Sequence, residues 1–317
     1  MVQIVSRRLN SEDYKILAKI TKSARKDTPV ESEKTLEEIQ QNIEKLCTDE
    51  KFRKMIAFNE AENIVGWIYY YVGFPLMAFI SGFQPILDKT DEADEIALAL
   101  IEAAKKDIVQ HGFSRLEIEL VFPTKAHRTY SERFVDLYRK CGFKFAAEEV
   151  HMKTDLTILE LPKIDLPQGY VLRKFSEVSY DQLEGPGFQS LKDSMEGLFL
   201  SMSHAEQKVT LDYFFDKSTN YIEDASLILE REGEVIGFII TRLREDEPEI
   251  GPIGLVPEAR GQGLASYLLV RVLENLKNIG STSVYLDTTI TNLPAQKLYR
   301  KYGFEDVYYK QFYYWSP

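Results

Sequence analysis

The chain has 317 residues, of which 44% are hydrophobic and 28% are charged, a composition typical of soluble globular proteins with two ordinary domains. Its formal net charge of −11 argues against broad binding to nucleic-acid phosphates. The sequence has no apolar run of about 18 residues and its N-terminus lacks the apolar core of a signal peptide, so we expect a cytoplasmic protein that does not span a membrane.

The cysteines and histidines give no sign of a metal site or a disulfide framework. Cys47 and Cys141 are the two cysteines, and neither belongs to a CxxC pair or lies beside a pair of histidines. We therefore expect both to be reduced thiols in the core. The four histidines are scattered, and none has neighbours that mark a triad or a metal site, so we expect no metal cofactor.

Four segments of the first half have counterparts, in the same order, in the second half. They are an arginine-bearing strand before a polar helix start (6–17 and 172–183), a strand with one glycine (58–71 and 229–242), a buried strand (115–120 and 283–288) and LYRK-x-GF (137–143 and 298–304). Such a repeat indicates two copies of one fold. Because each copy mixes strands and helices, we expect two tandem α/β (α+β) domains, each with a mixed, largely antiparallel twisted sheet flanked by helices.

The boundary between the copies is predicted from two prolines. The segment LTILELPKIDLPQGY follows the first copy, and Pro162 and Pro167 interrupt any helix there. We therefore expect a first domain over residues 1–155, a linker over 156–169 and a second domain over 170–317, each of ordinary domain size.

In the first copy, a strand, Pro85 and a helix from about Ile96 are legible within residues 74–113. The turn between the proline and the helix is strongly acidic. It contains one lysine, Lys89, and five carboxylates: Asp88, Asp91, Glu92, Asp94 and Glu95. Acidic residues suit a helix N-terminus, but they repel any anion placed there.

The corresponding segment of the second copy is different. Residues 250–256 predict a short apolar strand that Pro257 ends, and an amphipathic helix follows from Leu264 to Gly280. Between them, Arg260–Ala265 reads RGQGLA, a turn almost free of side-chain bulk. The unpaired amides of a helix start and the helix dipole form an anion site, and glycine lets a phosphate approach the backbone. A flexible connection is the alternative interpretation.

Two other phosphate-binding motifs fit this turn poorly. A nucleotide P-loop requires GK[ST], which is missing, and a dinucleotide fingerprint requires a third glycine where Ser266 stands. A dinucleotide-dependent enzyme is therefore a minor alternative.

The second copy resembles the GNAT superfamily of N-acetyltransferases. The family's acetyl-CoA motif is a strand, a proline and then R/Q-x-x-G-x-G/A at the start of a helix, which Arg260–Ala265 matches. Residues 292–304 similarly resemble the family's N-x-x-A-x-x-L-Y-x-x-x-G-F. The resemblance covers residues 170–317 and, more loosely, 1–155, and mycothiol synthases have a similar tandem layout.

The resemblance implies an acyltransferase that binds acetyl-CoA and moves its acetyl group directly to a primary amine. It implies that the strand before Pro257 and the strand containing Leu286 splay apart to admit the pantetheine arm. The Leu255 amide would polarise the thioester carbonyl, and Arg260 would add positive charge near the pyrophosphate. The coenzyme-binding residues that the resemblance implies are Ile253, Gly254, Leu255, Arg260, Gly261, Gln262, Gly263, Leu264, Ala265, Ser266 and Asn292.

The resemblance also implies catalytic roles. Tyr299 would donate a proton to the coenzyme sulfur, although a tyrosine there also suits the apolar stripe of a helix. Glu249 would accept the ammonium proton, which a lysine-like amine with a pKa of about 10.4 must lose. An unbroken strand would turn Glu249 and Leu255 to one face, since their separation is even. A solvated acidic loop is the alternative for Glu249, and Asp287 is a lesser candidate for the base.

The acidic turn of the first copy would repel a pyrophosphate, so we expect that copy to be degenerate and not to bind coenzyme. Its LYRK-x-GF then serves folding, because Leu137 and Tyr138 pack a short helix and Gly142 lets that helix end.

We expect acetyl-CoA and an unidentified amine as the partners, with no nucleic acid, membrane or metal, and a monomer or a homodimer. Residues 185–220 should form helices that border the acceptor pocket. The alternative to an enzyme is a non-catalytic module that binds an acyl-CoA and reports it to another protein.

Overall fold

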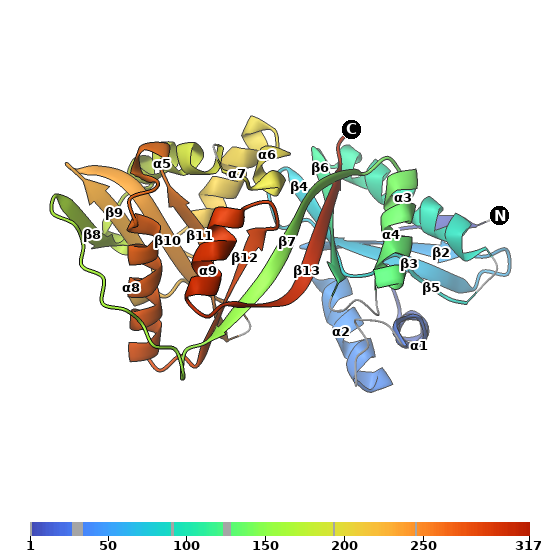
Figure 1. Cartoon of the computed structure of the whole chain (residues 1–317). Coiled ribbons are helices and arrows are strands. Elements are labelled where there is room, and N and C mark those ends of the chain that lie inside the picture. The colour runs from blue at the N-terminus through green and yellow to red at the C-terminus, as the bar shows by residue number, and fades with distance from the viewer. Residues whose placement is uncertain (1, 27–33, 90–91, 123–127, 193, 245) are drawn as a thin grey trace. The chain divides into compact units, whose positions relative to one another are not determined.

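The computed structural model describes residues 2–317 except 27–33, 90–91, 123–127, 193 and 245 (Figure 1). Its internal contacts divide the chain into two compact units, called here the first and second units: Met1–Ala146 with Lys310–Pro317, and Ala147–Tyr309. These bounds differ from the predicted ones, because the chain passes from one unit to the other within β7 (Lys144–Asp155) and again within β13 (Glu305–Trp315). The predicted linker, residues 156–169, belongs to the second unit.

In the described part of the first unit, a sheet lies between two layers of helices. The elements are β1 (Gln3–Val5), α1 (Ser11–Arg25), α2 (Leu36–Thr48), β2 (Phe52–Phe58), β3 (Ile64–Tyr71), β4 (Met77–Ser81), β5 (Ile86–Leu87), α3 (Ala93–Gln110), β6 (Arg115–Phe122) and α4 (Arg128–Lys140). The unit also takes in the start of β7 and the end of β13.

The sheet of the first unit has one parallel ladder. Its strands follow the order β1, β2, β3, β4, β6 and the C-terminal part of β13, and β5 pairs with β3. The β4–β6 ladder is parallel, whereas the β1–β2, β2–β3 and β3–β4 ladders are antiparallel. Helices α3 and α4 pack on one face around Leu100, Ile118 and Tyr138, and α1 and α2 pack on the other around Leu17 and Trp67.

The second unit repeats this plan. Its elements are the rest of β7, β8 (Tyr170–Lys174), α5 (Tyr180–Lys192), α6 (Gly197–Leu200), α7 (His204–Phe214), β9 (Leu227–Arg231), β10 (Glu234–Arg244), β11 (Glu247–Leu255), α8 (Leu264–Asn278), β12 (Ser283–Thr289), α9 (Leu293–Lys301) and the start of β13.

The sheet of the second unit is also mostly antiparallel. Its strands follow the order β7, β12, β11, β10, β9 and β8, and β11–β12 is the parallel ladder among antiparallel neighbours. Helices α8 and α9 pack on one face around Leu268 and Leu286, while α5, α6 and α7 pack around Leu183, Phe199 and Phe238 (Figure 1). A mixed, mostly antiparallel sheet flanked by helices confirms the predicted fold class.

The helix starts follow from short polar motifs. Helices α1, α2 and α7 each begin with a capping box, in which the N-cap side chain and the acidic residue three positions later bond to each other's backbone amides. Helix α3 begins at Ala93 rather than at Ile96, since Asp94 and Glu95 are favourable in a first helical turn. Helix α8 begins at Leu264, as predicted.

Neither cysteine is bonded to another. Cys141 is buried and Cys47 is half-buried, and burial raises the pKa of each thiol to about 11. Both therefore stay protonated at neutral pH, as inert thiols do. None of the helices in the described part of the chain has the length and apolarity needed to cross a bilayer.

Candidate active site

Strands β11 and β12 pair at one end and then separate. Their parallel ladder joins Glu249 to Tyr285 and Ile250 to Leu286. Strand β11 nevertheless continues to Leu255, and β12 continues to Thr289. The two strands therefore part beyond the second pair, which is the splayed arrangement that the sequence predicts.

A cavity of about 420 Å³ opens where these strands separate, a size usual for small-molecule sites. It is lined by eleven of the thirteen predicted site residues: Ile253, Gly254, Leu255, Arg260, Gly261, Gly263, Leu264, Ala265, Ser266, Asn292 and Tyr299. The other two, Gln262 and Glu249, are not part of its lining. The fold thus gathers residues from β11, the turn before α8 and the start of α9 around one space.

The turn before α8 owes its shape to two glycines. Gly261 and Gly263 have φ angles of +74° and +79°, in the left-handed region that glycine adopts without penalty. A Cβ added at either position would meet no heavy atom within 4 Å. Backbone conformation, rather than crowding by the rest of the protein, therefore explains why glycine is needed there.

This turn leaves the start of α8 without an internal cap. The first bond of the helical ladder runs from the Tyr267 amide to the Gly263 carbonyl at 3.1 Å, and Gly263 has no side chain to cap the helix. The amides of Leu264, Ala265 and Ser266 precede that bond, so they have no carbonyl within the helix to pair with. Together with the helix dipole they form a site suited to an anion.

Arg260 holds the end of β11 in place. Its Nε donates to the Leu255 carbonyl at 3.1 Å, and its Nη2 donates to the Ser190 carbonyl at 3.0 Å. The guanidinium therefore ties β11 to α5 through two main-chain acceptors. This structural role adds to the positive charge that the sequence analysis assigns to it.

The two predicted residues outside the cavity have partners elsewhere. Gln262 accepts a hydrogen bond from the Tyr170 hydroxyl at 2.8 Å and donates to the Glu258 carbonyl at 2.8 Å, so it braces the turn from outside. The carboxylate of Glu249 lies 3.3 Å from Arg244 Nε, and its side chain is 22% exposed. Glu249 therefore sits in an ion pair rather than in the cavity.

The prediction that Glu249 and Leu255 share a face assumed an unbroken strand, and β11 runs without interruption from Glu247 to Leu255. The register of β10 against β11 shifts between Ile239 and Thr241, where β11 has one residue more than β10. A bulge can change the alternation of side chains along a strand. Burial nevertheless alternates residue by residue along β11, with Glu249 and Leu255 both half-buried and Ile250 and Gly254 both buried, as expected if Glu249 and Leu255 share a face.

Tyr299 brings a protonated hydroxyl to the cavity. Its ring packs in the core near Phe304, with ring centroids 5.9 Å apart, and its side chain is 6% exposed. Burial first, and then the nearby Glu196 carboxylate, raise the pKa of Tyr299 well above its usual value. The hydroxyl therefore keeps its proton at neutral pH, as a proton donor must.

Asn292 and Glu196 form a polar pair at the cavity wall. The Asn292 Oδ1 accepts from the Ala295 amide at 3.3 Å, which confirms the expected helix-capping role. Its Nδ2 donates to Glu196 Oε1 at 3.2 Å, and Glu196 Oε2 accepts from the Thr289 hydroxyl at 2.9 Å. Sequence analysis missed Glu196, because it lies in the irregular segment between α5 and α6, where no periodic pattern or motif marks it.

Asp287, the lesser candidate for the base, is paired with a histidine. Its Oδ1 lies 2.7 Å from His151 Nδ1, and the His151 ring stacks between Tyr285 and Tyr308 at centroid distances of 5.1 and 4.5 Å. Because His151 is on β7, a strand distant in sequence, no local pattern could indicate this pair. The stacking holds the imidazole in place and favours a structural role for Asp287.

The first unit uses the corresponding elements differently. Its β4–β6 ladder pairs five positions, from Met77 with Arg115 to Ser81 with Glu119, so these strands do not separate as β11 and β12 do. The Tyr138 hydroxyl, which occupies the sequence position of Tyr299, donates to the Gln84 carbonyl at 3.0 Å. The repeated tyrosine therefore serves the fold in this unit.

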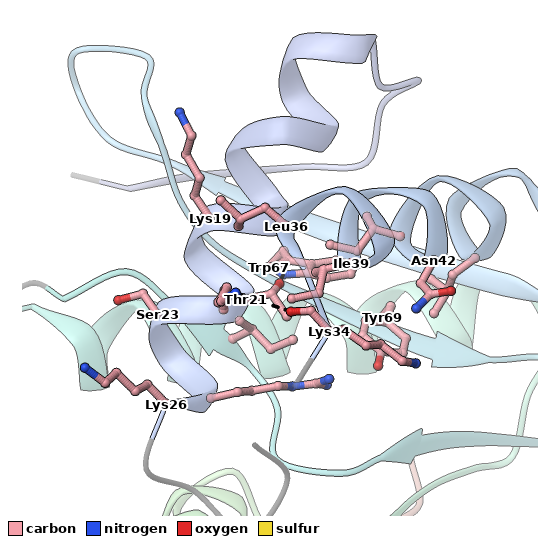
Figure 2. Close-up of a pocket in the computed structure, with 15 residues that line it drawn as sticks. Lys19, Thr21, Ser23, Lys26, Lys34, Leu36, Ile39, Asn42, Trp67 and Tyr69 are labelled. Atoms are coloured by element: carbon pink, nitrogen blue, oxygen red, sulfur yellow. Dashed lines mark hydrogen bonds between the residues drawn. The ribbon is translucent and has the colours of Figure 1, made fainter. Parts of the chain in front are cut away.

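The first unit has a cavity of its own at a different place. It has a volume of about 620 Å³ and lies between α1 and α2, above Trp67 and Tyr69 (Figure 2). Its described lining contains no carboxylate and contains five basic residues: Lys19, Lys22, Arg25, Lys26 and Lys34. The described lining of the second-unit cavity, by contrast, contains a carboxylate, that of Glu196, together with the buried phenol of Tyr299.

Comparison with known proteins agrees with this geometry. Residues 191–304, which contain the glycine turn, Asn292 and Tyr299, match the Acetyltransferase (GNAT) family. The chain therefore contains a GNAT acetyltransferase domain and is an acyltransferase.

The more particular likenesses are to acetyltransferases of the same length class. The chain is 25% identical over 243 residues to the mycothiol acetyltransferase of Arthrobacter sp. (strain FB24), covering 71% of each chain. It is 27% identical over 245 residues to that of Pseudarthrobacter chlorophenolicus, again covering 71% of each. These relatives support acetyl transfer by this chain.

Two solved structures have a similar fold over the whole chain. A GCN5-related N-acetyltransferase from Sphaerobacter thermophilus has a TM-score of 0.64 at 14% identity, covering 99% of this chain and 95% of that one. A tandem GNAT protein from the clavulanic acid biosynthesis pathway has a TM-score of 0.56 at 15% identity, covering 100% and 98%. The fold is therefore that of tandem GNAT proteins.

Proposed function

We propose that the second unit binds acetyl-CoA and transfers its acetyl group directly to the nitrogen of a primary amine. The observation that carries this proposal is the single cavity lined by both the glycine turn before α8 and the phenol of Tyr299. The glycine turn suits a diphosphate, and the phenol is a proton donor for a departing thiolate. In acetyl-CoA, the pantetheine arm joins a diphosphate at one end to the thioester sulfur at the other.

The coenzyme's diphosphate would bind at the start of α8. The amides from Gly261 to Ser266, including those of Gln262 and Gly263, would bind it, and the two glycines, which lack a Cβ, would let it approach the backbone closely. Arg260, held by main-chain carbonyls, would add a fixed positive charge. The first unit has an acidic α3 start and closed strands, so we propose that it does not bind coenzyme in this manner.

The thioester would lie between the separated strands. Backbone groups of Ile253, Gly254 and Leu255 line the cavity there, and an amide donor such as that of Leu255 would stabilise the developing oxyanion. Removal of one such donor costs roughly 3 to 4 kcal/mol of barrier in other enzymes. Asn292 would contact the pantetheine arm with the amide hydrogen that Glu196 does not take.

Tyr299 would protonate the sulfur of coenzyme A as the carbon–sulfur bond breaks. Its hydroxyl lines the cavity and keeps its proton at neutral pH, for the reasons of burial and charge given above. Glu249 stays the base that the family resemblance proposes, although its ion pair with Arg244 engages its carboxylate.

The direct test is turnover. Purified protein is incubated with acetyl-CoA and, separately, with spermidine, glucosamine, tyramine and a lysine-containing peptide, while a chromogenic disulfide reports free thiol and mass spectrometry identifies the amide. We expect thiol and amide to form in equal amounts with at least one amine. Binding of coenzyme without turnover across the panel would favour the non-catalytic acyl-CoA module, and tighter binding of NAD than of CoA would favour a dinucleotide enzyme.

A further inference from the structure

We propose that Glu196 is the group that binds the acceptor's ammonium and takes its proton, so that the cavity admits the acceptor in its cationic form. This inference rests on the proposed function and deepens it, since it assigns the base to α5–α6 rather than to β11. Glu196 lies just before α6 as its N-cap residue, and it lines the same cavity as Tyr299 and the glycine turn.

The Glu196 carboxylate accepts two hydrogen bonds and can accept more. Thr289, at the end of β12, donates to one oxygen, and Asn292, at the start of α9, donates to the other. An ionised carboxylate has about four acceptor positions. Each oxygen therefore has a position left for an ammonium hydrogen, while the two existing bonds fix the direction in which the carboxylate points.

The charge of Glu196 is not balanced by its two partners. Thr289 and Asn292 are both neutral, and the cation of the described cavity lining, Arg260, donates to the carbonyls of Leu255 and Ser190. A negative charge in a partly dry cavity attracts a cation of matching size. The first-unit cavity, with its basic lining, has the opposite preference.

A second polar residue of the cavity wall is Ser190. Ser190 is 3% exposed and lines the cavity, and its Oγ is buried without a hydrogen-bond partner among the described residues. Buried hydroxyls almost always have a partner. Ser190 lies on the same α5–α6 wall as Glu196.

The position of Glu196 suits the reaction better than that of Glu249. Glu196 and Tyr299 both line the cavity, and the Glu196 charge contributes to the raised pKa of Tyr299. Glu249 is outside the lining and lies 3.3 Å from Arg244. Amine acylation requires an acid and a base that act on one space, and Glu196 and Tyr299 line the same cavity.

The proton and electron movements then balance. An ammonium proton passes to a Glu196 oxygen and later to solvent, and the free nitrogen lone pair forms a bond to the thioester carbon. The carbon–sulfur bond breaks and its electron pair leaves with sulfur. The sulfur takes the Tyr299 proton, and the phenolate oxygen takes the second proton from the new amide nitrogen.

The test uses two coenzyme analogues that need no knowledge of the natural acceptor. S-(2-aminoethyl)-CoA carries an ammonium one bond further from sulfur than the attacking nitrogen, and S-propyl-CoA replaces that ammonium by a methyl group. Calorimetry measures both affinities for the wild-type protein and for Glu196→Gln. The matched control is Glu184→Gln, which removes a carboxylate on α5 whose described partners are Lys208 and the Tyr180 hydroxyl, all of them outside the cavity lining.

We expect the wild-type protein and Glu184→Gln to prefer the ammonium analogue by about 10- to 100-fold, the range of one charge-assisted hydrogen bond. Glu196→Gln should bind S-propyl-CoA as the wild type does and should lose the preference to within about threefold. With an amine that the wild type acetylates, its kcat/KM should fall about 10²- to 10⁴-fold.

Three results would overturn the inference. Glu196→Gln could keep the ammonium preference, or the wild-type protein could bind both analogues equally. In either case S-propyl-CoA binding would leave the proposed coenzyme site standing, and Glu249→Gln would be the next variant to measure. If neither analogue binds the wild-type protein, the proposed function fails together with the inference.

Discussion

The two copies of LYRK-x-GF allow one chemical change to be made in two environments. Tyr299→Phe and Tyr138→Phe each remove a single hydroxyl and keep the ring. Tyr299 presents its hydroxyl to the cavity, whereas the Tyr138 hydroxyl is fully buried and donates to the Gln84 carbonyl at 3.0 Å. We expect the first change to impair activity and the second to impair stability.

The expected sizes follow from these contacts. Tyr138→Phe deprives a buried carbonyl of its donor, which costs about 1–3 kcal/mol of unfolding free energy. For a chain of this size, Tm should fall by roughly 2–4 °C for each kcal/mol. Tyr299→Phe removes the proton donor, so kcat should fall about 10²- to 10⁴-fold while the unfolding free energy changes by about 0.5 kcal/mol or less.

Both quantities can be measured on the same samples. Thiol release from acetyl-CoA with an active amine gives kcat, and thermal unfolding followed by circular dichroism gives Tm. The reasoning is refuted if Tyr299→Phe turns over at the wild-type rate. It is refuted equally if Tyr138→Phe, once correctly folded, slows turnover as much as Tyr299→Phe does.

Three further predictions concern the turn and the buried phenols. Gly263 and its hairpin control Gly233 have φ angles of +79° and +85° and open space around them. Gly263→Ala and Gly233→Ala should therefore each lower the free energy of unfolding by about 1–2 kcal/mol, but calorimetry should find weaker CoA binding for Gly263→Ala alone. Arg260→Gln, which loses two bonds to main-chain carbonyls, should raise the KM for acetyl-CoA more than it lowers kcat; the opposite split would contradict a binding role. Burial raises the pKa of Tyr138 and Tyr299, so above about pH 10 the folded chain keeps protons that the unfolded chain releases. Urea titrations should therefore show the unfolding free energy falling as pH rises above about 10. The fall should be less steep in the variant with phenylalanine at both positions.

The turn before α8 could be predicted because its determinants are local. Gly261 and Gly263 are needed for positive φ angles, and an apolar helical pattern starts at the next residue. The separation of β11 from β12 followed from the same segment by family resemblance. The positions of these backbone groups therefore depend on a few neighbouring residues, which a single sequence displays.

The charges of the site could not be predicted in the same way. Glu196 acquires its place from contacts with Thr289 and Asn292, which are about a hundred residues away in the chain. Glu249 has a suitable spacing in the sequence, but it is paired with Arg244 and does not line the cavity. Carboxylates take their roles from tertiary contacts, and no periodic pattern records those contacts.

The repeated tyrosine is a second case in which tertiary contacts determine the role of a side chain. Tyr138 and Tyr299 have nearly identical neighbours in sequence. In both copies a glycine with a positive φ angle, Gly142 or Gly303, follows the end of the helix. Their hydroxyls nevertheless meet a carbonyl in one unit and a cavity in the other. Local sequence determines the helix, and the strands around it determine what the hydroxyl can do.

The strand β13 has a consequence for how this chain can be dissected. Tyr313 is 1% exposed within the core of the first unit, and Lys105 Nζ lies 4.7 Å from the centre of the Trp315 ring. A fragment of residues 1–155 would lack the C-terminal part of β13, so the core of its first unit would be open. The complementary fragment, residues 156–317, would lack β7, the strand that pairs with β12. Recombinant halves should be made as circular permutants or co-expressed fragments that restore each borrowed strand.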